Sequence, residues 1–186
     1  MVNIKGHNKE LYKKSYFNNR IFENKYYYMS LQWIKYLKPL NAFDMGCGQG
    51  FFVHAFNYYE VPTKGYDISE SAISNAYGLS KGCISTNVSV GEKYELVVCS
   101  DVLEHIPAVE EQCFIDTLIS LSSKHIVCSI CDITLKDAYP DPTHCNLRSR
   151  AYWIYQFEKR GWKSLKVPDD WYYHEQLYIF ERDEQK

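Results

Sequence analysis

The 186-residue sequence predicts an α/β fold with a doubly wound, mostly parallel β-sheet, and three observations support this. Short apolar strands alternate with amphipathic helical segments, as in sheets that helices cover on both faces. Residues 95–100 form a mainly apolar run, as a central parallel strand does. Gly46, Gly48 and Gly50 follow an apolar segment ending in Asp44, which is typical of a tight turn between a strand and a helix.

Local signals place the elements in order along the chain. A helix is predicted within residues 11–37, because apolar residues recur there at helical spacing (Phe22, Tyr26, Met29, Trp33 and Leu37), and Lys38-Pro39 ends it. An earlier short helix is expected at residues 10–19. Strands are predicted at residues 42–45, 64–67, 83–86, 95–100, 125–130, 162–167 and 176–181. Helices are predicted over 51–59, 69–78, 108–121 and 149–160, with Ser69 and Ser149 as N-caps. Residues 131–147 read as an irregular insertion.

Two further motifs follow the glycine turn. Asp67 lies 23 residues after Asp44, at the end of the second strand, where a βαβ cofactor fold holds ribose hydroxyls. The segment Asp101-Val-Leu-Glu-His105 follows the strand at residues 95–100. Dinucleotide-binding enzymes also have a glycine turn after a strand, so the turn alone does not identify the class of cofactor. The two further motifs restrict the possible classes.

The patterns D-x-G-C-G-x-G, G-x-D-I-S and D-V-L-E-H-I together resemble class I S-adenosylmethionine-dependent methyltransferases, over roughly residues 40–182. The resemblance implies a Rossmann-like, seven-stranded sheet with an antiparallel edge hairpin. We expect residues 1–40 to form an N-terminal helical cap and residues 41–186 to form the donor-binding domain. Residues 134–148 fall outside the family pattern.

The resemblance also implies which residues bind the methyl donor, S-adenosyl-L-methionine. Asp67 would accept the ribose hydroxyls, Ile68 would flank the adenine, and Asn87 would bind its amino group. The other residues assigned to the donor are Asp44, Gly46, Cys47, Gly48, Gly50, Ser100 and Asp101.

The motifs say less about which residues act on the methyl acceptor. His144 is the first candidate base, because it lies in the insertion after the fifth strand and its imidazole can take a proton near pH 7. His105 and Asp101 are further candidates, and Asp141 and His174 remain options.

No metal ligand is predicted. Cys128 and Cys131 have zinc-like spacing, but residues three apart on a strand face opposite sides. Asp101, Asp132 and Asp141 could supply a cluster of acids for a metal, although no spacing demands one.

Charge is distributed unevenly along the chain. Residues 1–40 carry eight basic and two acidic residues, whereas residues 41–186 carry thirteen basic and twenty-one acidic residues. The basic segment could meet anions, and Tyr16 and Arg20 are candidates for contacting the donor carboxylate or an anionic acceptor. The acidity of the remainder makes a broad nucleic-acid interface less favoured.

Seven cysteines and the absence of a signal sequence or membrane-spanning run predict a cytoplasmic protein with reduced thiols. No feature indicates an oligomeric state.

The favoured function is methyl transfer to a small-molecule acceptor at oxygen, nitrogen or carbon. A Pro-Pro-Tyr tetrad after the fourth strand, typical of amino-methylating relatives, is absent. Three alternatives stay open: a methyltransferase acting on RNA or protein through the basic segment, a non-catalytic donor-binding partner subunit, and a nicotinamide-dependent oxidoreductase.

Overall fold

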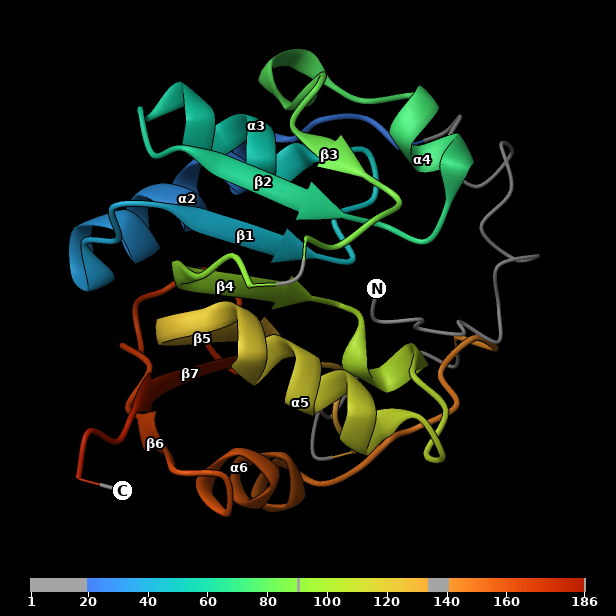
Figure 1. The fold of residues 1–186 in the computed structure, drawn as a ribbon. Helices are drawn as coiled ribbons and strands as arrows, with labels where there is room; N and C mark the ends of the chain where they lie inside the picture. The colour runs from blue at the N-terminus through green and yellow to red at the C-terminus, as the bar shows by residue number, and fades with distance from the viewer. Residues whose placement is uncertain (1–19, 90, 134–140, 186) are drawn as a thin grey trace.

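A computed structural model describes residues 20–89, 91–133 and 141–185 (Figure 1). Its centre is a seven-stranded sheet in the order β3-β2-β1-β4-β5-β7-β6. The strands are β1 (Ala42–Met45), β2 (Thr63–Tyr66), β3 (Ile84–Ser85), β4 (Tyr94–Ser100), β5 (Ser122–Ser129), β6 (Trp162–Leu165) and β7 (Leu177–Arg182). Neighbours from β3 to β5 pair in parallel, whereas β7 pairs antiparallel with both β5 and β6. The predicted mixed sheet with an antiparallel edge hairpin is therefore confirmed.

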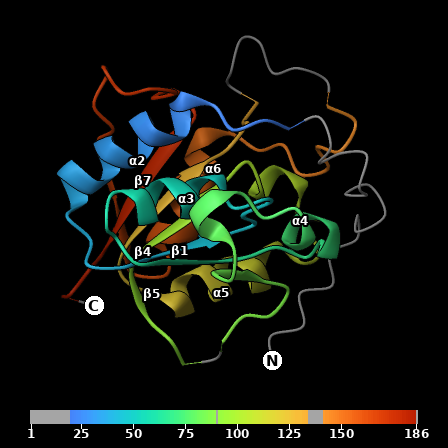
Figure 2. The same ribbon diagram turned by 90° about the horizontal axis from the view of Figure 1, so that it is seen from above.

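Helices cover both faces of this sheet (Figures 1 and 2). The helices α2 (Asn24–Leu37) and α3 (Phe51–Tyr58) pack on one face, with Trp33 stacked on Phe52 at 5.0 Å between ring centroids. The helices α5 (Glu111–Leu121) and α6 (Arg150–Glu158) pack on the other face. This double covering explains why the central strands read as apolar runs rather than as alternating patterns.

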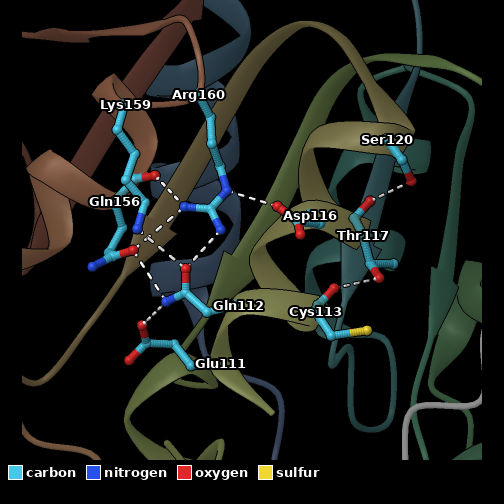
Figure 3. A network of polar contacts seen from close by, with 9 residues as sticks. All are labelled: Glu111, Gln112, Cys113, Asp116, Thr117, Ser120, Gln156, Lys159 and Arg160. Atoms are coloured by element: carbon cyan, nitrogen blue, oxygen red, sulfur yellow. Dashed lines mark hydrogen bonds and ion pairs between the residues drawn. The ribbon is translucent and has the colours of Figure 1, made fainter. Parts of the chain in front are cut away.

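Polar contacts link α5 to α6 at the surface (Figure 3). The Arg160 guanidinium donates to Asp116 at 2.6 Å and to Gln112 Oε1 at 2.8 Å. Gln112 Nε2 donates in turn to Gln156 Oε1 at 3.1 Å. One planar cation with several donors thus holds both helices on the same face of the sheet.

The helix α2 keeps most of the apolar stripe predicted for it. Met29, Trp33 and Leu37 are buried, and the helix ends where Lys38 adopts φ 50° and its N–H donates to the Ile34 carbonyl. Phe22 lies before the first helical residue, where its ring stacks on Tyr77 at 4.9 Å. The predicted helix at residues 10–19 falls outside the described residues.

Two helices are shorter than predicted. The helix α4 (Glu70–Ser74) has Ser69 as its N-cap, as predicted, but it ends before Gly78, which instead opens the 3₁₀ turn η1 (Gly78–Ser80). The helix α5 begins at Glu111 rather than residue 108, because the Pro107 carbonyl first accepts the Glu110 N–H in a turn. Within the described part of the chain, no helix is both long and apolar enough to cross a bilayer.

Candidate active site

The carboxyl ends of three parallel strands define the site. The strands β1, β2 and β4 point the same way and end at one edge of the sheet (Figure 1). The glycine turn follows β1, Asp67 follows β2, and Asp101 follows β4. The fold therefore brings together three motifs that are separated by up to 57 residues in the sequence, at the edge where open α/β sheets bind ligands.

The glycine turn needs its glycines for two physical reasons. Gly46, Gly48 and Gly50 all adopt positive φ, at 81°, 53° and 79°, where side chains are strained. A Cβ on Gly46 would also lie 2.5 Å from Val102 Cγ2, so the turn packs directly against the segment after β4. A Cβ on Gly50 would lie 2.5 Å from Ser80 Cβ.

Two backbone amides hold the carboxylate of Asp67. Oδ2 accepts the N–H of Gly48 and Oδ1 accepts the N–H of Ser69, both at 2.8 Å. A carboxylate offers about four acceptor positions, so lone pairs on both oxygens remain for a further ligand. Burial raises the pKa of Asp67, while the amides of Ser69 and Gly48 and the charge of Arg20 act to lower it.

Asp44 differs from Asp67 in its surroundings. It is only 2% exposed. Burial, followed by the neighbouring charge of Asp67, raises its pKa to about 8. Burial likewise raises the pKa of the adjacent Cys47 thiol. Near neutral pH the carboxyl group of Asp44 is therefore mostly protonated and uncharged.

Asp101 projects from the end of β4, directly after the half-buried Ser100. It adopts φ 55°, an unusual conformation for a residue with a side chain. The Ser129 hydroxyl donates to Asp101 Oδ1 at 2.8 Å, and the Asp101 N–H donates to the Ser129 carbonyl at 2.9 Å. The neighbouring β5 thus fixes the exposed carboxylate at the edge of the sheet.

The start of α2 lies near this edge. The charge of Arg20 acts on both Asp67 and Tyr26, and the charge of Asp101 also acts on Tyr26. The predicted candidate Arg20 therefore lies near Asp67 at this edge, whereas Tyr16 falls outside the described residues.

The structure brings His105 and His144 together. The two ring centroids lie 4.7 Å apart, although 38 residues separate them in the sequence. The Glu104 carbonyl accepts the N–H groups of Cys145 and Asn146, both at 3.0 Å. These bonds tie the insertion to the turn after β4, which places His144 beside His105.

Glu104 lies beneath the two histidines and is 1% exposed. Its Oε1 accepts the Cys131 N–H at 2.9 Å. Burial, and then the nearby charge of Asp101, raise its pKa to about 8. In the sequence, Glu104 stands out only as part of the motif at residues 101–105. The adjacent Glu and His after a strand are the signal that could have indicated it as a site residue.

The remaining predicted site residues contact parts of the structure other than Asp67, Asp101 and the two histidines. Ile68 is half-buried and packs against the core beside α5. Asn87 is exposed, and its N–H donates to Ser85 Oγ at 3.2 Å. The N–H of His174 donates to the Trp171 carbonyl in the loop between β6 and β7. Asp132 accepts a hydrogen bond from the Tyr178 hydroxyl. Within the described part of the chain, Asp101, Asp132 and Asp141 do not form a group of potential metal ligands.

The geometry and a comparison of sequence families agree on the class of protein. Residues 26–167 match the model of the methyltransferase domain family, Methyltransf_23. The chain belongs to this family, and its sheet order is that of class I S-adenosylmethionine-dependent methyltransferases.

The sequence is also similar to part of one curated relative. The chain is 30% identical over 109 residues to magnesium-protoporphyrin O-methyltransferase of Synechocystis sp. PCC 6803. That alignment covers 53% of this chain and 47% of the relative, so it spans about half the length of the curated protein.

Solved structures share the fold over most of the chain. The crystal structure of magnesium protoporphyrin IX methyltransferase from Synechocystis PCC 6803 with bound SAH gives a TM-score of 0.69 at 18% identity and covers 95% of both chains. The DhpI–SAH complex gives a TM-score of 0.69 at 11% identity, covering 100% of this chain and 98% of that one.

Proposed function

We propose that the chain transfers a methyl group from S-adenosylmethionine to a small-molecule acceptor, with a hydroxyl oxygen as the methylated atom. The main observation in support is the carboxylate of Asp67. Two backbone amides orient it at the edge of the sheet, and its remaining lone pairs can accept hydrogen bonds from a ligand. Family membership supplies the reaction class. The curated relative is an O-methyltransferase by name, which favours oxygen over nitrogen or carbon.

The donor side acts by positioning. The methyl carbon of a sulfonium is attacked in line, opposite sulfur, so the main requirement is a fixed near-attack geometry. Asp67 accepts the ribose hydroxyls, and Gly46, Cys47 and Gly48 let the donor approach the main chain. Ser100 and Asp101 face the donor's ammonium group with a carbonyl and a carboxylate. Ile68 flanks the adenine, and Asn87 is assigned to its amino group.

The acceptor side lies between the turn after β4 and the insertion. Attack by a hydroxyl requires loss of its proton, and His144, His105 and Asp101 are the candidate groups at that position. The distance of 4.7 Å between the two imidazole rings supports a shared role at one acceptor atom.

Donor binding tests the first half of the proposal. We expect Asp67→Asn to weaken S-adenosylhomocysteine binding at least tenfold in calorimetry, since a charged hydrogen bond contributes about 1.5–3 kcal/mol. The matched control is Glu158→Gln, which removes an exposed carboxylate on α6 (Figure 1) and should leave the affinity unchanged. Binding of NAD in place of S-adenosylhomocysteine would refute the proposal.

The class of acceptor is tested by supplying the protein with methyl-labelled donor and three separate fractions. We expect label to enter a metabolite extract. Label in total RNA or in protein would instead support the alternative acceptor classes, for which the basic residues 1–40 provide the argument. Labelling of none of the fractions, with donor binding intact, would favour a non-catalytic donor-binding subunit.

A further inference from the structure

Three side chains at the acceptor side form a group with the composition of a metal site. Glu104, His105 and His144 each offer one ligand atom, and these atoms all lie within 4.8 Å of one another. Two imidazoles and one carboxylate match the ligands of catalytic zinc and of other first-row transition ions that keep open positions. The set contains one hard oxygen and two nitrogens, so Mg²⁺ is a poorer match than Zn²⁺.

Two buried polar atoms of this group lack a hydrogen-bond partner among the described residues. Within the described part of the chain, Glu104 Oε2 and His144 Nδ1 are buried without a hydrogen-bond partner, and Glu104 as a whole is only 1% exposed. Leaving a buried polar atom unpaired costs about 1–3 kcal/mol, so such atoms call for an explanation. One carboxylate oxygen of Glu104 is held by the Cys131 N–H at 2.9 Å, which leaves Oε2 as the oxygen able to bind a cation.

The surroundings of His105 fix which of its nitrogens carries the proton. The Thr143 hydroxyl donates to Asp141 Oδ1 at 2.6 Å, so its oxygen is an acceptor toward His105 Nδ1 at 2.9 Å. The Thr143 carbonyl, at 3.3 Å from the same nitrogen, can only accept. Both contacts therefore place the proton on Nδ1 and the lone pair on Nε2. A ligating histidine that donates its other ring N–H to a nearby acceptor, such as a backbone carbonyl, is the usual arrangement around protein-bound metals.

We propose that Glu104, His105 and His144 bind one divalent transition-metal ion of the Zn²⁺ type at the acceptor side of the site. Ligand atoms around a tetrahedral zinc ion lie about 3.3 Å apart, given bonds of about 2.0–2.1 Å. The present separations, up to 4.8 Å, thus need only small side-chain rotations to close. The bonds from Cys145 and Asn146 to the Glu104 carbonyl hold this part of the insertion beside Glu104 and His105.

The ion's role rests on the proposed function, whereas its binding does not. An ion at this position would polarise the acceptor hydroxyl and lower its pKa. The hydroxyl proton leaves to water, an oxygen lone pair forms the new C–O bond, and the C–S bonding pair returns to sulfur, which loses its positive charge. The two histidines are then metal ligands rather than proton acceptors.

Metal titration tests the binding directly. The full chain, treated with a chelator, is titrated with Zn²⁺ by calorimetry and with Co²⁺ by visible absorption, without donor or acceptor. We expect one equivalent of either ion per chain and much weaker binding of Mg²⁺. Glu104→Gln should lower the Zn²⁺ affinity at least tenfold while its amide oxygen still accepts the Cys131 N–H, and His144→Ala should do the same.

Matched controls separate this cluster from other ligands. His125→Gln disrupts the other histidine–carboxylate pair, His125 with Glu181 at 3.4 Å, and should leave Zn²⁺ affinity unchanged. Cys131→Ser should also leave it unchanged. Thr143→Val should weaken Zn²⁺ binding about 10–100-fold, the usual effect of losing a group that orients a ligand, and it supplies a second test if Glu104→Gln fails to fold.

The outcomes distinguish this proposal from the proposed function. Failure of the wild-type chain to bind Zn²⁺ or Co²⁺ would overturn it, as would equal Zn²⁺ affinities in wild type, Glu104→Gln and His144→Ala. If the chain binds S-adenosylhomocysteine but no metal ion, the proposed methyl transfer is retained and the metal site is refuted. Zn²⁺ binding by a chain that does not bind S-adenosylhomocysteine would support the metal site and refute the proposed methyl transfer.

Discussion

At the scale of single residues, two neighbouring carboxyl groups of the site have different surroundings. The carboxylate of Asp67 accepts two backbone amides, whereas Asp44 is buried and has a pKa of about 8. Both acids were identified from the sequence by their places at the ends of predicted strands. Their different surroundings were not identifiable there, since burial and amide contacts come from the folded chain.

The raised pKa of Asp44 has a consequence for stability. Because the folded state holds a proton that the unfolded state releases above about pH 4, stability should decline by up to about 1.4 kcal/mol per pH unit until about pH 8. Asp44→Asn removes this dependence. We expect its melting temperature to exceed that of the wild type by an amount that grows from pH 5 to pH 8. Parallel melting profiles for the two proteins would contradict the assigned pKa.

Gly46 is required for both its conformation and its lack of a side chain. Gly46→Ala combines φ 81° with a contact of 2.5 Å to Val102, so we expect it to lower the free energy of unfolding by more than strain alone. Gly82→Ala is the matched control, since φ is 79° there and no atom lies within 4 Å of its Cβ. The control should cost about 1–2 kcal/mol, and equal losses in urea unfolding would show that the contact with Val102 is unimportant.

At the scale of elements, the apolar stripe of α2 was predictable and the ends of α4 and α5 were not. Helical spacing alone identified Met29, Trp33 and Leu37, all of which are buried. Beyond the early end of α4, the Tyr77 N–H donates to the carbonyl of the distant Gln49 at 2.9 Å rather than to a helical partner. Such contacts between distant segments leave no local signal in the sequence.

The seating of α2 on the sheet is testable through Trp33. This side chain is fully buried and stacks on Phe52. We expect Trp33→Ala to cost about 3–5 kcal/mol in chemical denaturation. Tyr28→Ala, at a position of the same helix that is 61% exposed, should cost less than about 0.5 kcal/mol. A small loss for Trp33→Ala would mean that α2 packs only loosely on the sheet.

At the scale of the whole molecule, residue patterns and resemblance contributed different parts of the prediction. The alternation of strands and helices indicated a parallel α/β fold, but the antiparallel edge hairpin followed only from the family resemblance. The pairing of His105 with His144 depends on main-chain bonds from Glu104 to the insertion, so neither source could supply it. The general edge of the site was therefore predictable, whereas the arrangement of its acceptor side required the structure.

A crystal structure of the chain with S-adenosylhomocysteine tests the proposed donor site most directly. We expect ligand density at the carboxyl edge of β1, β2 and β4, with both ribose hydroxyls within hydrogen-bonding distance of Asp67 and the sulfur facing His105 and His144. Density at another place, or a saturated crystal with no ligand beside Asp67, would contradict the proposed donor site.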